Sequence, residues 1–150
     1  MKTLPRFLAS LSLLAGLMAT PPATAETHHV KMLNRNAQGA MVYEPDFLKV
    51  KPGDVVKFRA TTSGHDAASI DGMMPAGAQA FKGKINEEIE VRFTEEGLYG
   101  IKCLPHYAMG MVMLIQVGDK ADPASLQVPE AVPARARKRF QEIVGRATGQ

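Results

Sequence analysis

The stretch that decides the fold is residues 98–117, which read LYGIKCLPHYAMGMVMLIQV. Residues 98–103 and 111–117 are apolar runs of strand length, and Pro105 and Gly110 bend the chain between them. The stretch therefore predicts two strands joined by a compact loop, and the loop carries the single cysteine of the chain, Cys103.

Further strands are predicted outward from this stretch. Residues 88–93 alternate, so that Ile89, Val91 and Phe93 share one face of a strand. Pro52-Gly53-Asp54 is a turn tripeptide, and we expect it to join strands at 47–51 and 55–59 as a pair. With residues 28–34, at least six short strands without a long helical period predict an all-β, two-sheet antiparallel sandwich.

Two segments depart from the strand pattern. Residues 61–86 are predicted to be a long loop with one helical turn around residues 76–82. After Gly118, Asp122-Pro123 begins a short helix and Pro133 a second one. The second helix is expected to pack its apolar residues on the sandwich and to expose its basic residues to solvent, with docking to an acidic surface as the alternative. The apolar residues are Ala136, Phe140, Ile143, Val144 and Ala147, and the basic ones are Arg135, Lys138, Arg139 and Arg146.

The amino terminus has the pattern of a secretory signal peptide. Lys2 and Arg6 precede an apolar run at 7–18, which ends near Ala23-Thr24-Ala25. The run falls short of the roughly 20 residues that cross a bilayer, so a membrane anchor is the weaker alternative. We therefore predict a signal peptide at 1–25, a sandwich at 26–118, a helical extension at 119–150 and export of the protein.

Composition excludes several classes of protein. One cysteine in 150 residues forms no intrachain disulfide. Residues 26–150 hold 16 Lys and Arg against 15 Asp and Glu, which lacks the basic excess of a nucleic-acid-binding protein. We expect a monomer that neither binds nucleic acid nor spans a membrane. We find no hydrolytic or phosphate-binding motif, so an enzyme is not predicted.

A metal site is predicted at the loop of residues 103–111. Cys103, His106 and a methionine supply sulfur and nitrogen donors, a soft set that suits copper. His65 follows a glycine in a distant loop and is the best candidate for a second imidazole. Met109 and Met111 compete for the remaining position, and we favour Met111 because at period two its side chain points inward.

The other histidines and methionines are not expected to be ligands of the predicted metal site. His28 and His29 lie at the predicted mature terminus, where solvated or adventitious metal-binding roles are expected. The remaining methionines are expected to be packing or rim residues, since methionine fills irregular gaps. They are Met32, Met41, Met73, Met74 and Met113.

The mature chain resembles the pseudoazurin family. The resemblance rests on Gly64-His65, on residues 84–87 and 102–111, and on the helical extension. It implies a Greek-key, cupredoxin-like sandwich and one type 1 copper ion held by a ligand set of four residues. Those ligands are His65, Cys103, His106 and Met111. It further implies a periplasmic electron carrier that donates to redox partners such as copper nitrite reductase.

One residue departs from the family pattern. Pseudoazurins usually have Asn after the first histidine, where its amide joins the two ligand loops and donates toward the cysteine sulfur. This chain has Asp66, and an ionised carboxylate has no side-chain hydrogen to donate. We therefore expect a changed reduction potential with the same ligands.

The sequence also predicts a docking surface, and it leaves two alternative functions open. His106 is expected to reach the surface among apolar residues, with Lys82, Lys84 and Lys102 as a ring that steers acidic partners or as ordinary solvated charges. The apolar residues expected around it are Met41, Leu104, Pro105, Ala108 and Met109. A copper storage or delivery protein is the main alternative function. A thiol redox protein is disfavoured because Cys103 lacks a resolving partner.

Overall fold

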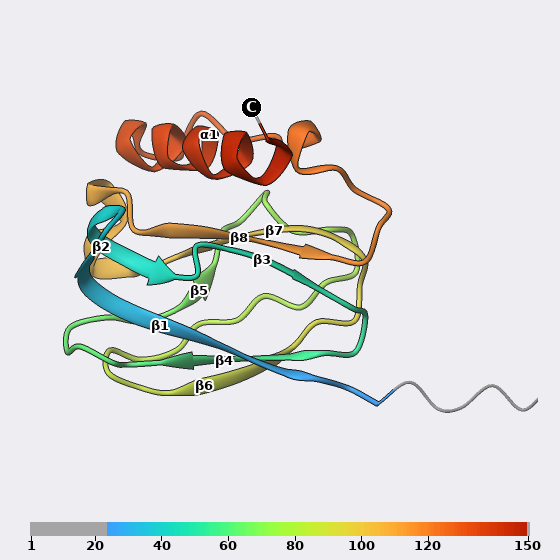
Figure 1. The fold of residues 1–150 in the computed structure, drawn as a ribbon, viewed down its shortest axis with the longest axis horizontal. Helices are drawn as coiled ribbons and strands as arrows, with labels where there is room; N and C mark the ends of the chain where they lie inside the picture. The colour runs from blue at the N-terminus through green and yellow to red at the C-terminus, as the bar shows by residue number, and fades with distance from the viewer. Residues whose placement is uncertain (1–23, 150) are drawn as a thin grey trace, which may run out of the picture.

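The computed structural model describes residues 24–149, which form a two-sheet β-sandwich with one helix on its outer face (Figure 1). Most of the predicted signal peptide, residues 1–23, lies outside the described residues. The strands are β1 (Thr27–Asn36), β2 (Gly39–Glu44), β3 (Phe47–Val50), β4 (Val55–Arg59), β5 (Ala68–Ser69), β6 (Ile89–Arg92), β7 (Gly97–Lys102) and β8 (Val112–Val117). The predicted sandwich class is therefore confirmed.

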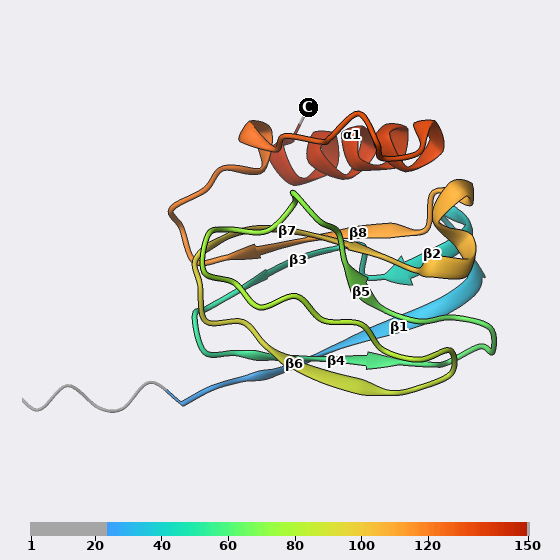
Figure 2. The same ribbon diagram turned by 180° about the vertical axis from the view of Figure 1, so that it is seen from behind.

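The two sheets are mixed rather than wholly antiparallel. One has the strand order β2-β1-β4-β6 and the other β3-β8-β7-β5. β1 pairs with β4 in parallel, and β3 pairs with β8 in parallel, while the remaining pairs are antiparallel. The chain repeatedly passes from one sheet to the other, so strands that are distant in sequence become parallel neighbours (Figures 1 and 2).

The predicted pairing around Pro52-Gly53-Asp54 is wrong. β3 and β4 lie in different sheets, so the tripeptide carries the chain across the sandwich instead of closing a hairpin. The turn chemistry itself is as expected, because Gly53 has φ +95° and the Asp54 carboxylate accepts the Lys51 N–H at 2.9 Å. Turn residues thus predicted the reversal, but they did not predict which sheet the next strand joins.

The segment of residues 61–86 has no helical turn at 76–82. It instead contributes the short strand β5, and Ala68 forms a bridge with Lys82. Ser69 accepts the Phe81 N–H through its hydroxyl, and the Phe81 ring lies 5.9 Å from that of Phe58. Phe81 is thereby anchored against the core, which favours an extended path over a helical one.

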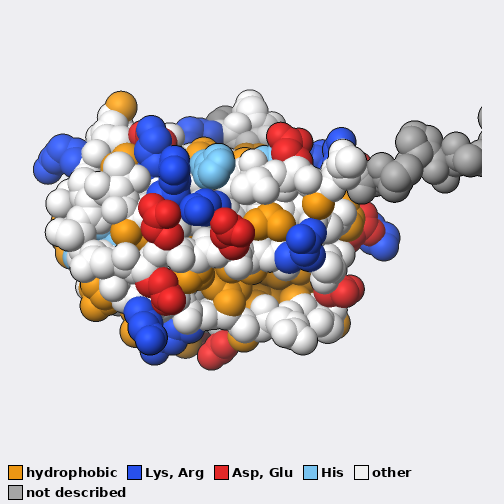
Figure 3. Space-filling model, turned by 90° about the horizontal axis from the view of Figure 1, so that it is seen from below, with side chains coloured by type: hydrophobic (Ala, Val, Ile, Leu, Met, Phe, Trp, Pro, Cys, Tyr) orange, Lys and Arg blue, Asp and Glu red, His pale blue; other side chains and the backbone are white. Residues whose placement is uncertain are grey.

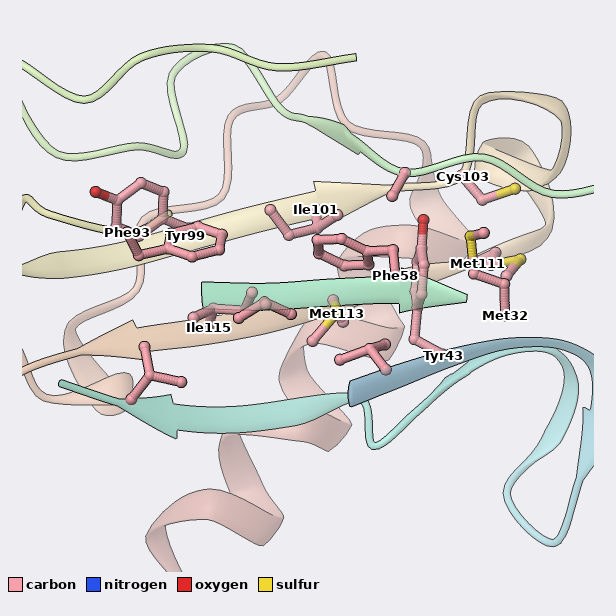
Figure 4. Close-up of a cluster of buried hydrophobic side chains, with 14 of the residues drawn as sticks. Met32, Tyr43, Phe58, Phe93, Tyr99, Ile101, Cys103, Met111, Met113 and Ile115 are labelled. Atoms are coloured by element: carbon pink, nitrogen blue, oxygen red, sulfur yellow. The ribbon is translucent and has the colours of Figure 1, made fainter. Parts of the chain in front are cut away.

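The core lies between the two sheets, and Figure 4 shows its central side chains. Phe58, Ile101, Met113 and Ile115 are fully buried there. In β6, Ile89 and Val91 turn toward this cluster, while the intervening Glu90 is exposed, as the alternation predicted.

Acidic and basic side chains are interspersed on the face shown in Figure 3.

The C-terminal segment packs against the outer side of the β3-β8-β7-β5 sheet. It contains a 3₁₀ turn, η2 (Pro123–Ser125), capped by Asp122, and the helix α1 (Ala134–Thr148), which Pro133 precedes as N-cap. A second apolar cluster joins Ala136, Phe140 and Ile143 of α1 to Val112 and Leu114 of β8.

The basic residues of α1 have two kinds of surroundings. Arg135 and Lys138 are exposed, as a solvated face requires. Arg146 instead pairs at 2.6 Å with the buried carboxylate of Asp46, which follows β2. Within residues 24–149, no helix has the length and apolar character needed to cross a membrane.

Candidate metal centre

Three predicted ligands from two distant loops of the chain converge at one end of the sandwich. Cys103 follows β7, His106 lies in the 3₁₀ segment η1 (Leu104–Met109), and His65 lies in the loop before β5. The Cys103 Sγ is 3.7 Å from His65 Nδ1 and 3.5 Å from His106 Nδ1. Each residue offers a ligand atom within 4.8 Å of the others, so a single ion can contact all three.

Met111, the favoured fourth ligand, is fully buried in the same core cluster as Cys103. Figure 4 shows its side chain at the Cys103 end of the core, close to Met32. Met109 is 44% exposed and lies on the surface of the loop. Burial therefore favours Met111 over Met109 as the residue that faces the metal.

Backbone hydrogen bonds hold the ligand loop in a compact shape. The Cys103 N–H donates to Met111 O at 3.0 Å, and the Met111 N–H donates to His106 O at 3.1 Å. Gly110 ends η1 with φ +89°, and a Cβ at this position would lie 3.1 Å from the backbone oxygen of Arg135. The loop therefore needs glycine here both for its left-handed backbone and for its contact with α1.

The orientation of His65 is set by Asn34, a residue for which the sequence analysis predicted no role. Asn34 lies in β1, and its Oδ1 is 2.8 Å from His65 Nε2. Because the amide oxygen accepts, Nε2 carries the hydrogen and Nδ1 keeps a lone pair directed toward Cys103 Sγ. Asn86 fixes the same loop by accepting the Gly64 N–H at 2.6 Å.

The protonation states of the donors follow from burial. Burial, followed by the charge of nearby His106, lowers the pKa of His65, which favours the neutral imidazole that binds metals. Burial raises the pKa of the Cys103 thiol to about 11, although the backbone N–H groups of Asp66 and His106 act in the opposite direction. A metal that binds here must therefore displace a tightly held proton from sulfur.

Asp66 connects the two ligand loops, but its side chain accepts a hydrogen bond where an asparagine amide could donate one. Its carboxylate is buried and accepts the Leu104 N–H at 2.6 Å, and its backbone oxygen accepts the Tyr43 hydroxyl hydrogen at 2.7 Å. The connection that the family's asparagine was expected to supply is therefore kept. What changes is the charge next to Cys103, since a carboxylate replaces a neutral amide.

The surface above the donors combines apolar and basic residues. His106 is half-buried, whereas Leu104 and Met109 beside it are 45% and 44% exposed. Lys82 and Lys102 line one surface hollow together with Leu104, and the Lys102 Nζ lies 5.1 Å from the centre of the Tyr107 ring. Of the predicted apolar surround, Met41 is half-buried and packs against the core cluster.

The donor chemistry fits copper. A cysteine sulfur and two imidazole nitrogens around one point, with a buried thioether nearby, match the His₂Cys arrangement with a weak axial methionine found in blue copper sites. Magnesium and calcium prefer oxygen ligands, which are not among these donor atoms.

Comparison with known proteins agrees with this chemistry. The family model for copper binding proteins of the plastocyanin/azurin family matches residues 30–118. The chain belongs to this family, and copper is its cofactor.

Within that family the chain is similar to pseudoazurins over most of its length. It is 45% identical over 127 residues to the pseudoazurin of Paracoccus pantotrophus, which covers 84% of this chain and 88% of the relative. The crystal structure of pseudoazurin from Methylobacterium extorquens AM1 superposes with a TM-score of 0.67 at 43% identity, over 79% of this chain and 99% of that one. Native pseudoazurin from Hyphomicrobium denitrificans gives a TM-score of 0.72 at 38% identity, over 80% and 97% of the two chains.

Proposed function

We propose that this chain is a periplasmic one-electron carrier and that His65, Cys103, His106 and Met111 hold its copper ion. The observation that carries the proposal is the convergence of the Cys103 sulfur and two imidazole nitrogens at a buried point beneath a partly apolar surface. Bound copper supplies a Cu(II)/Cu(I) couple.

Hydrogen bonds within the protein hold the proposed ligands in place. Asn34 holds the His65 ring, and backbone hydrogen bonds hold the loop from Cys103 to Met111. Donors that are held in place by other groups need little rearrangement when the charge of the ion changes. No substrate bond forms or breaks, so the proposed role is that of a carrier and not of an enzyme.

Docking is proposed at the surface around His106. Leu104 and Met109 provide exposed apolar contact area beside this ligand, which permits close approach by a redox partner. Lys82 and Lys102 lie next to this area and favour an acidic partner. Copper nitrite reductase or another respiratory enzyme is the proposed acceptor.

Export is proposed to remove residues 1–25 and leave Glu26 as the first residue. The observations that support it are the charged start, the short apolar run and the small residues before the cleavage point. The mature protein then comprises the sandwich at 26–118 and the extension at 119–150.

The decisive experiment is an absorption spectrum of the protein after loading with Cu(II). We expect an intense thiolate-to-copper band in the visible range that a mild reductant bleaches and an oxidant restores. His65→Gly should alter this band, and external imidazole should restore it in part. A protein that binds Cu(I) tightly, stays colourless with Cu(II) and passes the ion to a chelator would instead support copper storage or delivery.

A further inference from the structure

A second cluster of groups that could hold a metal ion lies where β1 begins, and Figure 1 shows this end of β1 far from the loop between β7 and β8. The Glu26 N–H donates to Asp54 Oδ1 at 2.9 Å, and His28 Nε2 lies 3.0 Å from Asp54 Oδ2. The side chains of Glu26, His28 and Asp54 each offer a ligand atom within 4.8 Å of the others. The structure thus gathers an imidazole and two carboxylates, and one of these carboxylates also accepts the backbone N–H of Glu26.

Processing changes the chemistry of that nitrogen. In the precursor it is an amide, which does not bind metals without losing its hydrogen. Cleavage after Ala25, which is part of the proposed function, converts it into a primary amine with a pKa of about 8. The new amine is then a nitrogen donor that already lies beside Asp54.

The spacing of the donors suits a metal ion. Nitrogen and oxygen ligands lie about 2.0–2.2 Å from zinc-sized ions. Two such ligands that subtend 90–110° at the ion are therefore about 3 Å apart. The separations of 2.9 and 3.0 Å from the two Asp54 oxygens to Glu26 N and His28 Nε2 have this size.

The charges of the cluster also suit a divalent ion. Burial acts to raise the pKa of Asp54, but hydrogen bonds from Glu26, His28 and Lys51 outweigh it and lower this pKa to about 2. The Asp54 carboxylate is therefore ionised at neutral pH, and with that of Glu26 it balances two positive charges. Lys49 lines the same hollow, but its ammonium pairs with Asp119 at 2.6 Å.

We propose that export creates a second metal site in this protein, in which the α-amine of Glu26, Nε2 of His28 and the carboxylate of Asp54 bind a divalent transition metal. Two nitrogens with oxygen ligands favour Ni(II), Cu(II) or Zn(II) over the Cu(I) that the sulfur-rich site accepts. The site is distinct from the copper centre in position, donor atoms and dependence on processing.

The test uses copper-loaded protein produced with Glu26 as its first residue and Ni²⁺ as the probe. Equilibrium dialysis with metal analysis, and calorimetric titration against a competing chelator, should show one bound Ni²⁺ per chain in addition to copper. His28→Gln should weaken Ni²⁺ binding at least tenfold. The matched control is His29→Gln, which removes the exposed neighbouring histidine and should leave the affinity unchanged.

Two further variants test the other donors. A chain that begins at Ala25 moves the amine by one residue, and Asp54→Asn removes the carboxylate charge, and each should also weaken binding at least tenfold. The visible band of the copper centre reports whether each variant is folded. If Asp54→Asn does not fold, the Ala25 chain and His28→Gln decide the question.

Several results would overturn the site. Equal Ni²⁺ affinity in the Ala25 chain would exclude the amine, and equal affinity in folded Asp54→Asn would mean that the terminus binds in another geometry. An equal loss in His29→Gln would indicate adventitious binding by the histidine pair. Mass spectrometry of the exported protein tests the cleavage point separately. A wrong cleavage point can therefore be distinguished from the absence of a second metal site.

Discussion

The two ends of the sandwich gather similar polar groups in different ways. At the copper end, Asn34 directs the His65 ring so that its free lone pair faces the Cys103 sulfur. At the other end, the hydrogens of Glu26 N and His28 meet the Asp54 oxygens directly. Donors that face one another at the first end need an ion, whereas the groups at the second end already satisfy one another. The copper end therefore presents lone pairs that converge on one point, whereas an ion at the other end must first replace the hydrogens that its groups share.

The largest effect is expected from Cys103→Ser. This variant removes the soft donor while it keeps the size of the side chain nearly unchanged, so the visible thiolate-to-copper band should disappear completely. Circular dichroism should show the same sandwich. A band of wild-type intensity in Cys103→Ser would mean that the sulfur is not a ligand and would remove the contrast between the two ends.

Asn34→Leu tests whether a supporting residue keeps the free nitrogen of the His65 ring directed toward the metal site. Loss of the acceptor frees the His65 ring to rotate, and we expect copper affinity to fall about 10–100-fold, the usual range for such supporting residues. A competition titration with a copper chelator measures this. Asn86→Leu removes a hydrogen bond to the same loop without touching the imidazole and should have a smaller effect.

Asp54→Asn tests the stabilising role of the other end. A carboxyl with a folded-state pKa of about 2, against about 4 when unfolded, contributes about 2 kcal/mol to the free energy of unfolding at neutral pH. This contribution is present above pH 4 and is lost as the pH falls toward 2. Urea unfolding at pH 7 and pH 2.5 should therefore show a large difference between wild type and variant only at pH 7. Equal stability at pH 7 would contradict the prediction.

Asp66→Asn tests the charge next to the sulfur. The amide keeps an oxygen for the Leu104 N–H, but it removes a negative charge that favours Cu(II), and it adds hydrogens that can be donated toward sulfur. We expect the reduction potential to rise by about 60 mV, which corresponds to a tenfold change in a one-electron equilibrium. Voltammetry at matched pH measures the shift, and an unchanged or lower potential would refute this explanation.

Lys102→Glu is expected to have the smallest effect. It reverses a charge beside Leu104 without touching a ligand, so the association rate with an acidic redox partner should fall several-fold at low salt and much less at high salt. Stopped-flow kinetics measure the rate at both salt concentrations. Lys57→Glu, in β4 and away from this hollow, is the matched control, and an equal effect in both variants would indicate net charge rather than local steering.

The sequence predicted those parts of the molecule in which the information is local. Cys103, His106 and Met111 lie within nine residues, and period two in residues 111–117 correctly placed Met111 inside. Alternation in β6 and helical spacing in α1 correctly predicted their buried faces. In each case the pattern depends only on neighbouring residues and on the geometry of one element.

The predictions that failed depend on the arrangement of distant segments. Pro52-Gly53-Asp54 predicts a reversal equally well for a hairpin and for a crossing between sheets, and only packing in three dimensions decides between them. Asn34 is 31 residues from His65, and nothing in its surroundings indicates which ring nitrogen it will contact. The helical turn expected at 76–82 gave way to the anchoring of Phe81 against Phe58.

Because Gly110 lies close to the backbone of Arg135, α1 supports the ligand loop of residues 103–111 from behind. Engineering by loop exchange must respect it. A transplanted sequence with any side chain at position 110 would push against the first turn of this helix and shift the metal ligands on either side. Conversely, removal of the helix would leave the sandwich its own core but take away the support behind the loop. We therefore expect the C-terminal extension to limit how far the ligand loop moves when the charge of the bound ion changes.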